Sequence, residues 1–311
     1  MIPTLRSLPV PQALRAHLQH AYGLEITGCT LLRSLVNDVY EIGTPKRRML
    51  LKLYRAGNWS INEVSWEVEL ASHLAAGGVP VPQVQPLADG KLVGTLDSGE
   101  GVRPFTLAEF IEGGKPRPPF DDKLYATFGR LVAAFHDAAD SFSSKCSRRP
   151  SDLRRRLDHP LAVILPILPG DDRVLVSELA AAARVHITQY AAQGLGWGVC
   201  HGDVSLDNIL VTGDGLSIHD FDLAAEGWRA ADLTGVASTS FWDAFAGGYT
   251  SRRALSDVDV ASIGWFDVIG RIFNLRFHLY DKPLIRGTES VGEGWADREL
   301  AGLRRAAGEL L

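Results

Sequence analysis

A change in hydrophobic periodicity near residue 113 constrains the fold of this 311-residue chain more than any other feature. Before the change, short segments alternate apolar and polar residues between turn residues, which is typical of antiparallel strands with one buried face. The expected strands cover residues 25–31, 39–42, 49–53, 91–96 and 103–111. Helical spacing occurs here only over residues 11–21 and 60–76, and the second helix is predicted to begin with Ser60 as N-cap and Glu63 three residues later. This part should form a small sheet with one major inserted helix.

The stretch from Gly113 to Pro119 reads GGKPRPP, and its glycines and prolines predict a connector. Beyond it, the apolar residues recur with the period of a helix. The expected helices cover residues 123–139, 174–192, 230–246, 258–279 and 296–310. The fold class predicted from these patterns is α+β, with two domains that cover residues 1–112 and 113–311.

Composition narrows the possible partners. The formal net charge is only −5 and 22% of the residues are charged, so neither nucleic acid nor an anionic membrane surface is an expected partner. The first residues lack the basic head and apolar run of a signal peptide, and a soluble, cytoplasmic protein is expected. Cys29, Cys146 and Cys200 are widely spaced and odd in number, which favours buried thiols over disulfides or a metal site. Nothing in the sequence fixes the oligomeric state.

Residues 198–222, GVCHGDVSLDNILVTGDGLSIHDFD, interrupt the helical part of the chain. Short apolar strands flank a turn at residues 213–215, so the segment should fold back and bring Asp203, Asn208, Asp220 and Asp222 near one another. Phosphoryl transfer needs such a set, because it depends on positioning and charge neutralisation. Asp203 would orient an acceptor hydroxyl and take its proton, while Asn208 and Asp220 offer the hard oxygen ligands that magnesium prefers. Asp222 would either assist the metal or cap the following turn.

The pattern H-G-D-x4-N followed by D-x-D resembles the catalytic and metal-binding loops of the aminoglycoside phosphotransferase family, which is itself similar to protein kinases. The resemblance implies a bilobal, protein-kinase-like fold, with a nucleotide-binding lobe over residues 1–112 and a catalytic, substrate-binding lobe over residues 113–311. It implies ATP as phosphate donor, with GTP left open, and Mg²⁺ as the metal. It also implies that His201 and Asp232 brace the catalytic loop.

The same resemblance assigns nucleotide-binding residues in the first lobe. Lys52 lies in an apolar strand, where a kinase-like fold places the lysine that contacts the α- and β-phosphates. Glu67, in the helix that follows, matches the glutamate that pairs with this lysine. Glu63 is the alternative, one turn earlier on the same face.

Two further segments are assigned by resemblance. The phosphate-covering loop falls at residues 33–38, which lack a G-x-G-x-x-G motif, and Ser34 and Asn37 are its candidate ligands. The hinge whose backbone binds adenine falls at Glu109, Phe110 and Ile111.

The resemblance also implies that the last helices and the loop after Asp222 bind the acceptor. Residues 241–311 contain ten acids and nine lysines and arginines, a balance that does not indicate a polycationic aminoglycoside as the acceptor. We expect a kinase that acts on a small-molecule hydroxyl, on an antibiotic or related natural product first. The alternatives are an amino alcohol, a sugar or a protein Ser/Thr side chain, the last because residues 54–60 weakly resemble a bacterial stress-response kinase branch. A catalytically silent scaffold is disfavoured, since it would not need Asp203.

Overall fold

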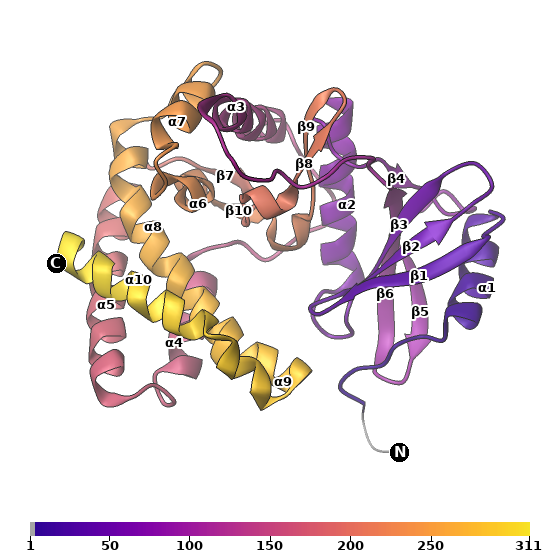
Figure 1. Ribbon diagram of the computed structural model, residues 1–311, viewed down its shortest axis with the longest axis horizontal. Helices are drawn as coiled ribbons and strands as arrows, with labels where there is room; N and C mark the ends of the chain where they lie inside the picture. Colours follow the sequence, from indigo (N-terminus) through magenta and orange to yellow (C-terminus); the bar gives the residue numbers. More distant parts are fainter. Residues whose placement is uncertain (1–3) are drawn as a thin grey trace. The chain divides into compact units, whose positions relative to one another are not determined.

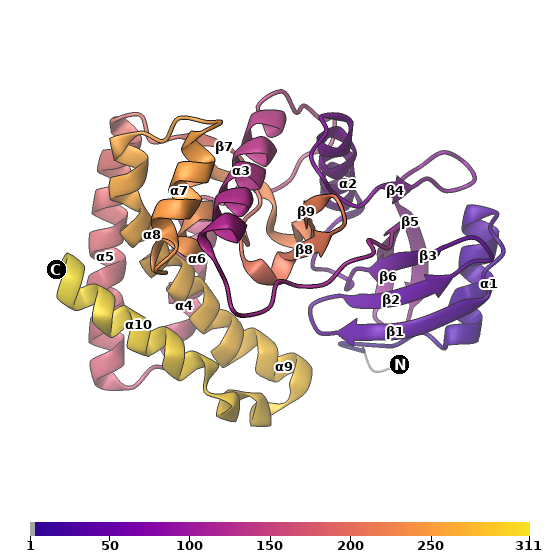
Figure 2. The same ribbon diagram turned by 45° about the horizontal axis from the view of Figure 1, so that its top comes forward.

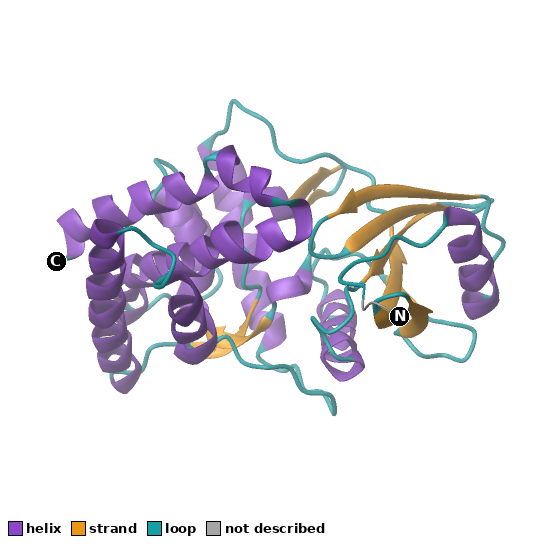
Figure 3. Cartoon of the chain, turned by 90° about the horizontal axis from the view of Figure 1, so that it is seen from below, coloured by secondary structure: helices purple, strands orange, loops and turns teal. Residues whose placement is uncertain are grey.

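The computed structural model describes residues 4–311, which divide into two compact units. The first unit takes in the described residues up to Pro116, together with Ser141–Arg148 and Leu206–Asp222. The second comprises Arg117–Asp140, Arg149–Ser205 and Leu223–Leu311. Strands dominate the first unit and helices the second (Figure 3). The predicted functional division of the chain at residue 112 stays a prediction, and residues 1–3 of its first domain lie outside the described residues.

The first unit is built on one antiparallel sheet in the order β1-β2-β3-β6-β4, with β5 also paired to β6 (Figure 1). The consecutive pairing of β1, β2 and β3 confirms the predicted meander. The strands are β1 (Gly28–Ser34), β2 (Asp38–Gly43), β3 (Arg48–Leu53), β4 (Val84–Gln85), β5 (Gly94–Ser98) and β6 (Gly101–Glu109). The helices of this unit are α1 (Pro11–Tyr22) and α2 (Ile61–Ala76), which lie on opposite sides of the sheet (Figures 1 and 2).

Alternation along β3 gives its two faces different environments. Met49, Leu51 and Leu53 are fully buried and pack in a cluster that includes Leu14 and Leu18 of α1. Successive side chains of a strand point to opposite faces, so Lys52 lies on the side that faces α2. The alternation of β3 therefore fixes the face of the sheet on which Lys52 lies.

Helix α2 begins as its sequence predicts. The Ser60 side chain accepts a hydrogen bond from the Glu63 backbone N–H at 3.2 Å, and the Glu63 carboxylate accepts one from the Ser60 N–H at 3.1 Å. This capping box satisfies two N–H groups that the helix itself cannot satisfy. The helix ends at Ala76, before Gly77 and Gly78, again as predicted.

A hairpin from the middle of the chain joins the first unit. Strands β8 (Ile209–Thr212) and β9 (Gly215–Ile218) pair antiparallel, which confirms the predicted turn between them. The Ile218 N–H donates to the Pro80 carbonyl oxygen at 2.9 Å, and Gly114 and Val211 form a bridge between backbones. The segment that carries the candidate metal ligands is therefore held by backbone bonds.

The second unit is mainly helical. Its helices are α3 (Asp122–Ala139), α4 (His159–Ile164), α5 (Gly170–Ala192), α6 (Thr234–Ala237), α7 (Trp242–Thr250), α8 (Asp257–Arg276), α9 (Lys282–Arg286) and α10 (Trp295–Leu310), and β7 (Trp197–Cys200) pairs with β10 (Ala225–Trp228). Helices α3 and α7 pack closely because Gly129 and Gly248 have no Cβ. A Cβ on Gly129 would collide with the Phe245 carbonyl oxygen, and one on Gly248 with that of Ala126.

The helix predicted over residues 230–246 is wrong. A 3₁₀ turn over Arg229–Leu233, the single turn of α6 and then α7 occupy this region, with a break between Ser238 and Phe241. Thr239 stabilises this break, because its hydroxyl donates to the Val236 carbonyl oxygen at 2.8 Å and accepts from the Phe241 N–H at 3.3 Å. Such local side-chain bonds compete with a continuous helix. Within residues 4–311, no helix combines the length and apolarity that crossing a membrane requires.

Candidate active site

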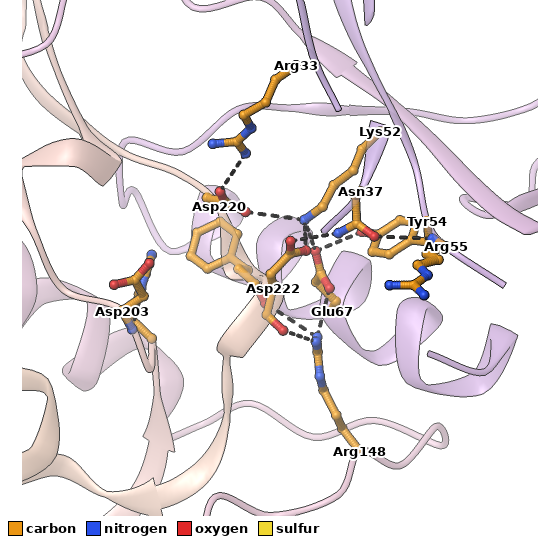
Figure 4. Close-up of polar contacts among 12 residues, drawn as sticks. Arg33, Asn37, Lys52, Tyr54, Arg55, Glu67, Arg148, Asp203, Asp220 and Asp222 are labelled. Atoms are coloured by element: carbon orange, nitrogen blue, oxygen red, sulfur yellow. Dashed lines mark hydrogen bonds and ion pairs between the residues drawn. The ribbon is translucent and has the colours of Figure 1, made fainter. Parts of the chain in front are cut away.

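Lys52 is the centre of a charged cluster in the first unit (Figure 4). Its Nζ lies 2.9 Å from Glu67 Oε1 and 3.5 Å from Asp220 Oδ1, and it forms an ion pair with Asp222. Burial disfavours the charged ammonium, but the carboxylates of Asp222 and Glu67 outweigh it and hold the pKa of Lys52 well above its ordinary value. Lys52 is therefore a fixed positive charge beside two acids of the D-x-D motif.

Glu67 is anchored through both carboxylate oxygens. Its Oε1 accepts from Lys52 and, at 2.7 Å, from the Tyr54 hydroxyl, while its Oε2 accepts from Arg148 at 2.8 Å. Burial would raise the pKa of Glu67, but the charges of Lys52 and Arg148 lower it below its ordinary value. Glu67 is thus the partner of Lys52, and Glu63 belongs to the cap of α2 instead.

Asp220 has an unusual backbone conformation. Its φ of 70° makes it the only non-glycine residue among residues 4–311 in the left-handed region, which aspartate tolerates better than most residues. Its Oδ2 lies 3.1 Å from the Arg33 guanidinium. Burial acts to raise the pKa of Asp220, but Lys52 and Arg33 prevail and lower it to about 2.

Asp222 is held differently from Asp220. Its Oδ2 accepts from the Asn37 amide at 2.7 Å. Burial raises the pKa of Asp222, and the nearby carboxylates of Asp220 and Glu67 raise it further. The positive charge of Lys52 offsets only part of this shift, which leaves the pKa at about 6. Two acids separated by one residue therefore titrate in very different ranges, a pattern that is common in functional sites.

Ser34 and Asn37, the two candidates in the phosphate-covering loop, belong to different hydrogen-bond networks. Asn37 joins the acidic cluster: its amide nitrogen donates to Asp222, and its carbonyl oxygen accepts from the Arg55 N–H at 3.2 Å. Ser34 lies in another network, where its hydroxyl donates to Asp38 at 2.5 Å and contacts Arg6. Their roles toward a nucleotide stay predictions.

The predicted hinge follows the end of β6. Glu109 is the last residue of that strand, and its N–H donates to the Gln83 carbonyl at 2.8 Å. The Phe110 ring lies 4.2 Å below the Arg48 guanidinium, and Ile111 follows outside the sheet. Adenine contacts by this backbone stay a prediction.

Asn208 lies at the base of the hairpin, one residue before β8. Its side chain is buried, and its backbone carbonyl oxygen accepts from the His219 N–H at 3.0 Å. This bond places Asn208 next to the strand end that leads into Asp220, as the hairpin predicts. Within residues 4–311, no group of three or more His, Cys, Asp or Glu side chains is arranged as a metal site, so the metal roles of Asn208, Asp220 and Asp222 stay predictions.

Asp203 belongs to the second unit, in a loop that Asp232 holds rigidly. One carboxylate oxygen of Asp232 accepts from the Gly202 N–H at 2.7 Å, and the other accepts from the His201 N–H at 2.7 Å and lies 3.0 Å from His136 Nε2. His201 is fully buried, and its Nδ1 accepts from the Asp203 N–H at 3.3 Å. His201 and Asp232 thus contact the loop as the resemblance implies.

A cavity of about 290 Å³ opens beside Asp203 in the second unit. Asp267, Arg271 and Phe273 of α8 and Glu299 of α10 contribute to its lining. Arg271 lies 2.7 Å from Asp267 and 3.2 Å from Glu299, so each of these acids already has a partner. The lining holds Asp152, Asp203, Asp232, Asp267 and Glu299 against Arg156 and Arg271.

Several residues of the cluster were missed by sequence reasoning. Arg33, Tyr54 and Arg148 contact Asp220 or Glu67, and Arg156 donates to the Gly202 carbonyl at 2.8 Å beside the cavity. Arg148 and Arg156 lie in an irregular, arginine-rich segment without a periodic pattern. No local signal distinguishes them from exposed arginines.

The chain resembles known proteins in both sequence and fold. A sequence model described as "Phosphotransferase enzyme family" matches residues 28–261. The homoserine kinase of Rhizobium johnstonii is 30% identical over 260 residues, which cover 78% of this chain and 76% of that protein.

Two solved structures resemble the fold closely. A microcompartment-associated aminopropanol kinase has a TM-score of 0.79 at 21% identity, covering 96% of this chain and 98% of that one. The amicoumacin kinase hAmiN, solved in complex with AMP-PNP, Ca²⁺ and Ami, has a TM-score of 0.78 at 17% identity, covering 94% of this chain and 92% of that one. The fold is α+β and protein-kinase-like, as predicted.

Proposed function

The chain belongs to the phosphotransferase enzyme family, as its resemblance to aminoglycoside phosphotransferases predicted, and is a kinase; from this premise we propose that it transfers the γ-phosphate of ATP to the hydroxyl of a small amino alcohol. The observation that carries the proposal is the rigid Asp203 loop beside a small cavity with more acids than bases. GTP remains the alternative donor.

The nucleotide side of the proposal rests on the cluster around Lys52. Its ammonium would neutralise the α- and β-phosphates, and Glu67 would hold it in place. Hard oxygen donors at Asn208, Asp220 and Asp222 fit a divalent cation, and the Ca²⁺ in the amicoumacin kinase complex supports this use of the fold. Mg²⁺, when bound, would supply charge neutralisation between the phosphates. Asp220 and Asp222 would then exchange their contacts with Lys52 for the cation.

On the acceptor side, Asp203 would orient the hydroxyl and remove its proton as the phosphate is transferred. The pocket favours a positively charged molecule of modest size, because its acids outnumber its arginines and its volume lies at the lower end of ligand sites, roughly 300–1,000 Å³. The names homoserine kinase and aminopropanol kinase both denote small hydroxyl acceptors that carry an amine. This combination favours an amino alcohol over the antibiotic expected first.

An antibiotic acceptor is the second candidate. It is supported by the similarity in fold to the amicoumacin kinase. The cavity described above belongs to one unit only, and a larger acceptor would have to extend beyond it.

The proposal is tested by an ADP-release screen with ATP and Mg²⁺. The panel contains amino alcohols, homoserine, simple sugars, hydroxyl-bearing antibiotics and a generic protein substrate. The proposal predicts the highest kcat/KM for an amine-bearing alcohol and little turnover of the matched alcohol without an amine. Preference for an antibiotic would establish the second candidate, and phosphorylation of protein alone would overturn both.

A further inference from the structure

Arg148 lies at the end of the segment Ser141–Arg148, which belongs to the first unit. Its side chain is fully buried, and its guanidinium lies 4.0 Å from the centre of the Trp59 ring and 5.9 Å from that of Trp66. Trp59 precedes the N-cap of α2, and Trp66 lies in the second turn of the helix. Burying an arginine is costly unless its charge is paired, so the contacts it makes are informative.

The contacts of Arg148 connect two elements of the proposed site (Figure 4). Its NH1 group donates to Glu67 Oε2 at 2.8 Å and to the Phe221 carbonyl oxygen at 3.4 Å. Its NH2 group donates to the carbonyl oxygen of Asp222. One planar group therefore binds the glutamate that anchors Lys52 and the backbone of the D-x-D motif at the same time.

We infer that Arg148 is a positioning residue that couples the Lys52–Glu67 pair to the loop of Asp220 and Asp222. Glu67 has two oxygens, and without Arg148 only the one facing Lys52 and Tyr54 would be fixed. The carboxylate could then turn about that oxygen, and Glu67 would hold the lysine charge less firmly. The D-x-D backbone would lose an anchor in the same step. The inference rests on the proposed nucleotide and metal roles of Lys52 and Asp220.

The substitution Arg148→Lys tests this role directly. It keeps the positive charge next to Glu67 but lacks the planar fork, so it reaches one partner at a time. The substitution Arg148→Met keeps much of the apolar volume beside the tryptophans and removes the charge. If Arg148 served only to pack against Trp59 and Trp66, nucleotide binding by the two folded variants would remain normal.

The experiment measures binding of AMP-PNP by calorimetry at several Mg²⁺ concentrations, which needs no acceptor. We compare wild type, Arg148→Lys, Arg148→Met and the control Arg47→Met, an exposed arginine of the first unit that contacts Gln85. Each is measured at least 10 °C below its own unfolding midpoint, a margin chosen so that unfolding does not enter. Lys52→Met is included to report whether this cluster binds nucleotide at all.

Arg148→Met should weaken Mg·AMP-PNP binding about tenfold or more and raise the Mg²⁺ concentration needed for half-maximal binding, because both anchors are lost. Arg148→Lys should recover part of the nucleotide affinity, and Arg47→Met should match wild type. Unchanged affinity and Mg²⁺ dependence in a folded Arg148→Met protein would overturn the inference, as would a lower unfolding midpoint alone. If Lys52→Met also bound normally, the proposed nucleotide site itself would be wrong.

Discussion

Removing the Lys52–Glu67 contact should lower kcat/KM for ATP. The other contacts of the two residues limit the size of this loss. A buried ion pair that loses one partner typically costs about 3–5 kcal/mol, because a charge is left unpaired. Here neither residue is left alone: Lys52 keeps Asp222 and Asp220, and Glu67 keeps Tyr54 and Arg148. What remains to be lost is one charge-assisted bond of 2.9 Å, about 2 kcal/mol, or roughly thirtyfold.

The assay is a double-mutant cycle with Lys52→Met and Glu67→Gln, read as kcat/KM for ATP in the ADP-release reaction. Lys52→Met should raise KM for ATP and lower kcat, Glu67→Gln should do the same more mildly, and the double variant should lose less than the sum. Glu63→Gln is the matched control, since glutamine can also accept from the Ser60 N–H in the capping box and the change should leave KM unchanged. Full additivity, with normal ATP constants in both single variants, would refute the pairing as a functional contact.

Three further predictions concern the aspartates. Asp203→Asn should reduce turnover by about 10²–10⁴-fold and leave AMP-PNP affinity nearly unchanged, since the lost group serves the acceptor; a collapse of calorimetric affinity would contradict this. Asp220→Asn should weaken Mg²⁺-dependent nucleotide binding while preserving the backbone, because asparagine also tolerates a positive φ, and an unaltered Mg²⁺ titration would move that role to Asp222. The raised pKa of Asp222, about 6, means that its stabilising contribution is complete below about pH 4 and is lost as the pH rises through 6. Metal-free wild type should therefore gain about 2 kcal/mol in unfolding free energy relative to Asp222→Asn between pH 7.5 and 4.5; a constant difference in denaturant titrations would show that Asp222 keeps its ordinary pKa.

The parts of the fold that depend on local pattern were predictable from the sequence. Alternation placed Lys52 on a strand, and the Ser60–Glu63 capping box placed the start of the helix that presents Glu67. The H-G-D-x4-N and D-x-D motifs lie on either side of a hairpin whose turn is also visible in the sequence. In each case the signal spans a few residues, so tertiary context was not needed to detect it.

Contacts between distant residues were not predictable in this way. Arg148 binds Glu67 across 81 positions of sequence and Arg33 binds Asp220 across 187, and neither pair has a spacing that an isolated sequence reveals. Ser34 and Asn37 are assigned to one phosphate-covering loop by resemblance, and the sequence does not reveal that β1 ends at Ser34 with its hydroxyl donating to Asp38. The prediction of one helix over residues 230–246 is wrong because it rests on apolar spacing alone. That spacing does not show the hydroxyl bonds of Thr239 that break the helix.

The most direct test of the account follows the phosphate itself by ³¹P NMR. Wild-type protein is incubated with ATP, Mg²⁺ and the preferred amine-bearing alcohol from the screen, in parallel with Asp203→Asn. The account predicts that a phosphomonoester signal grows in step with ADP in the wild-type sample and is nearly absent with Asp203→Asn, whose nucleotide affinity is unchanged. Release of inorganic phosphate without a phosphomonoester, or equal rates in the two proteins, would contradict it.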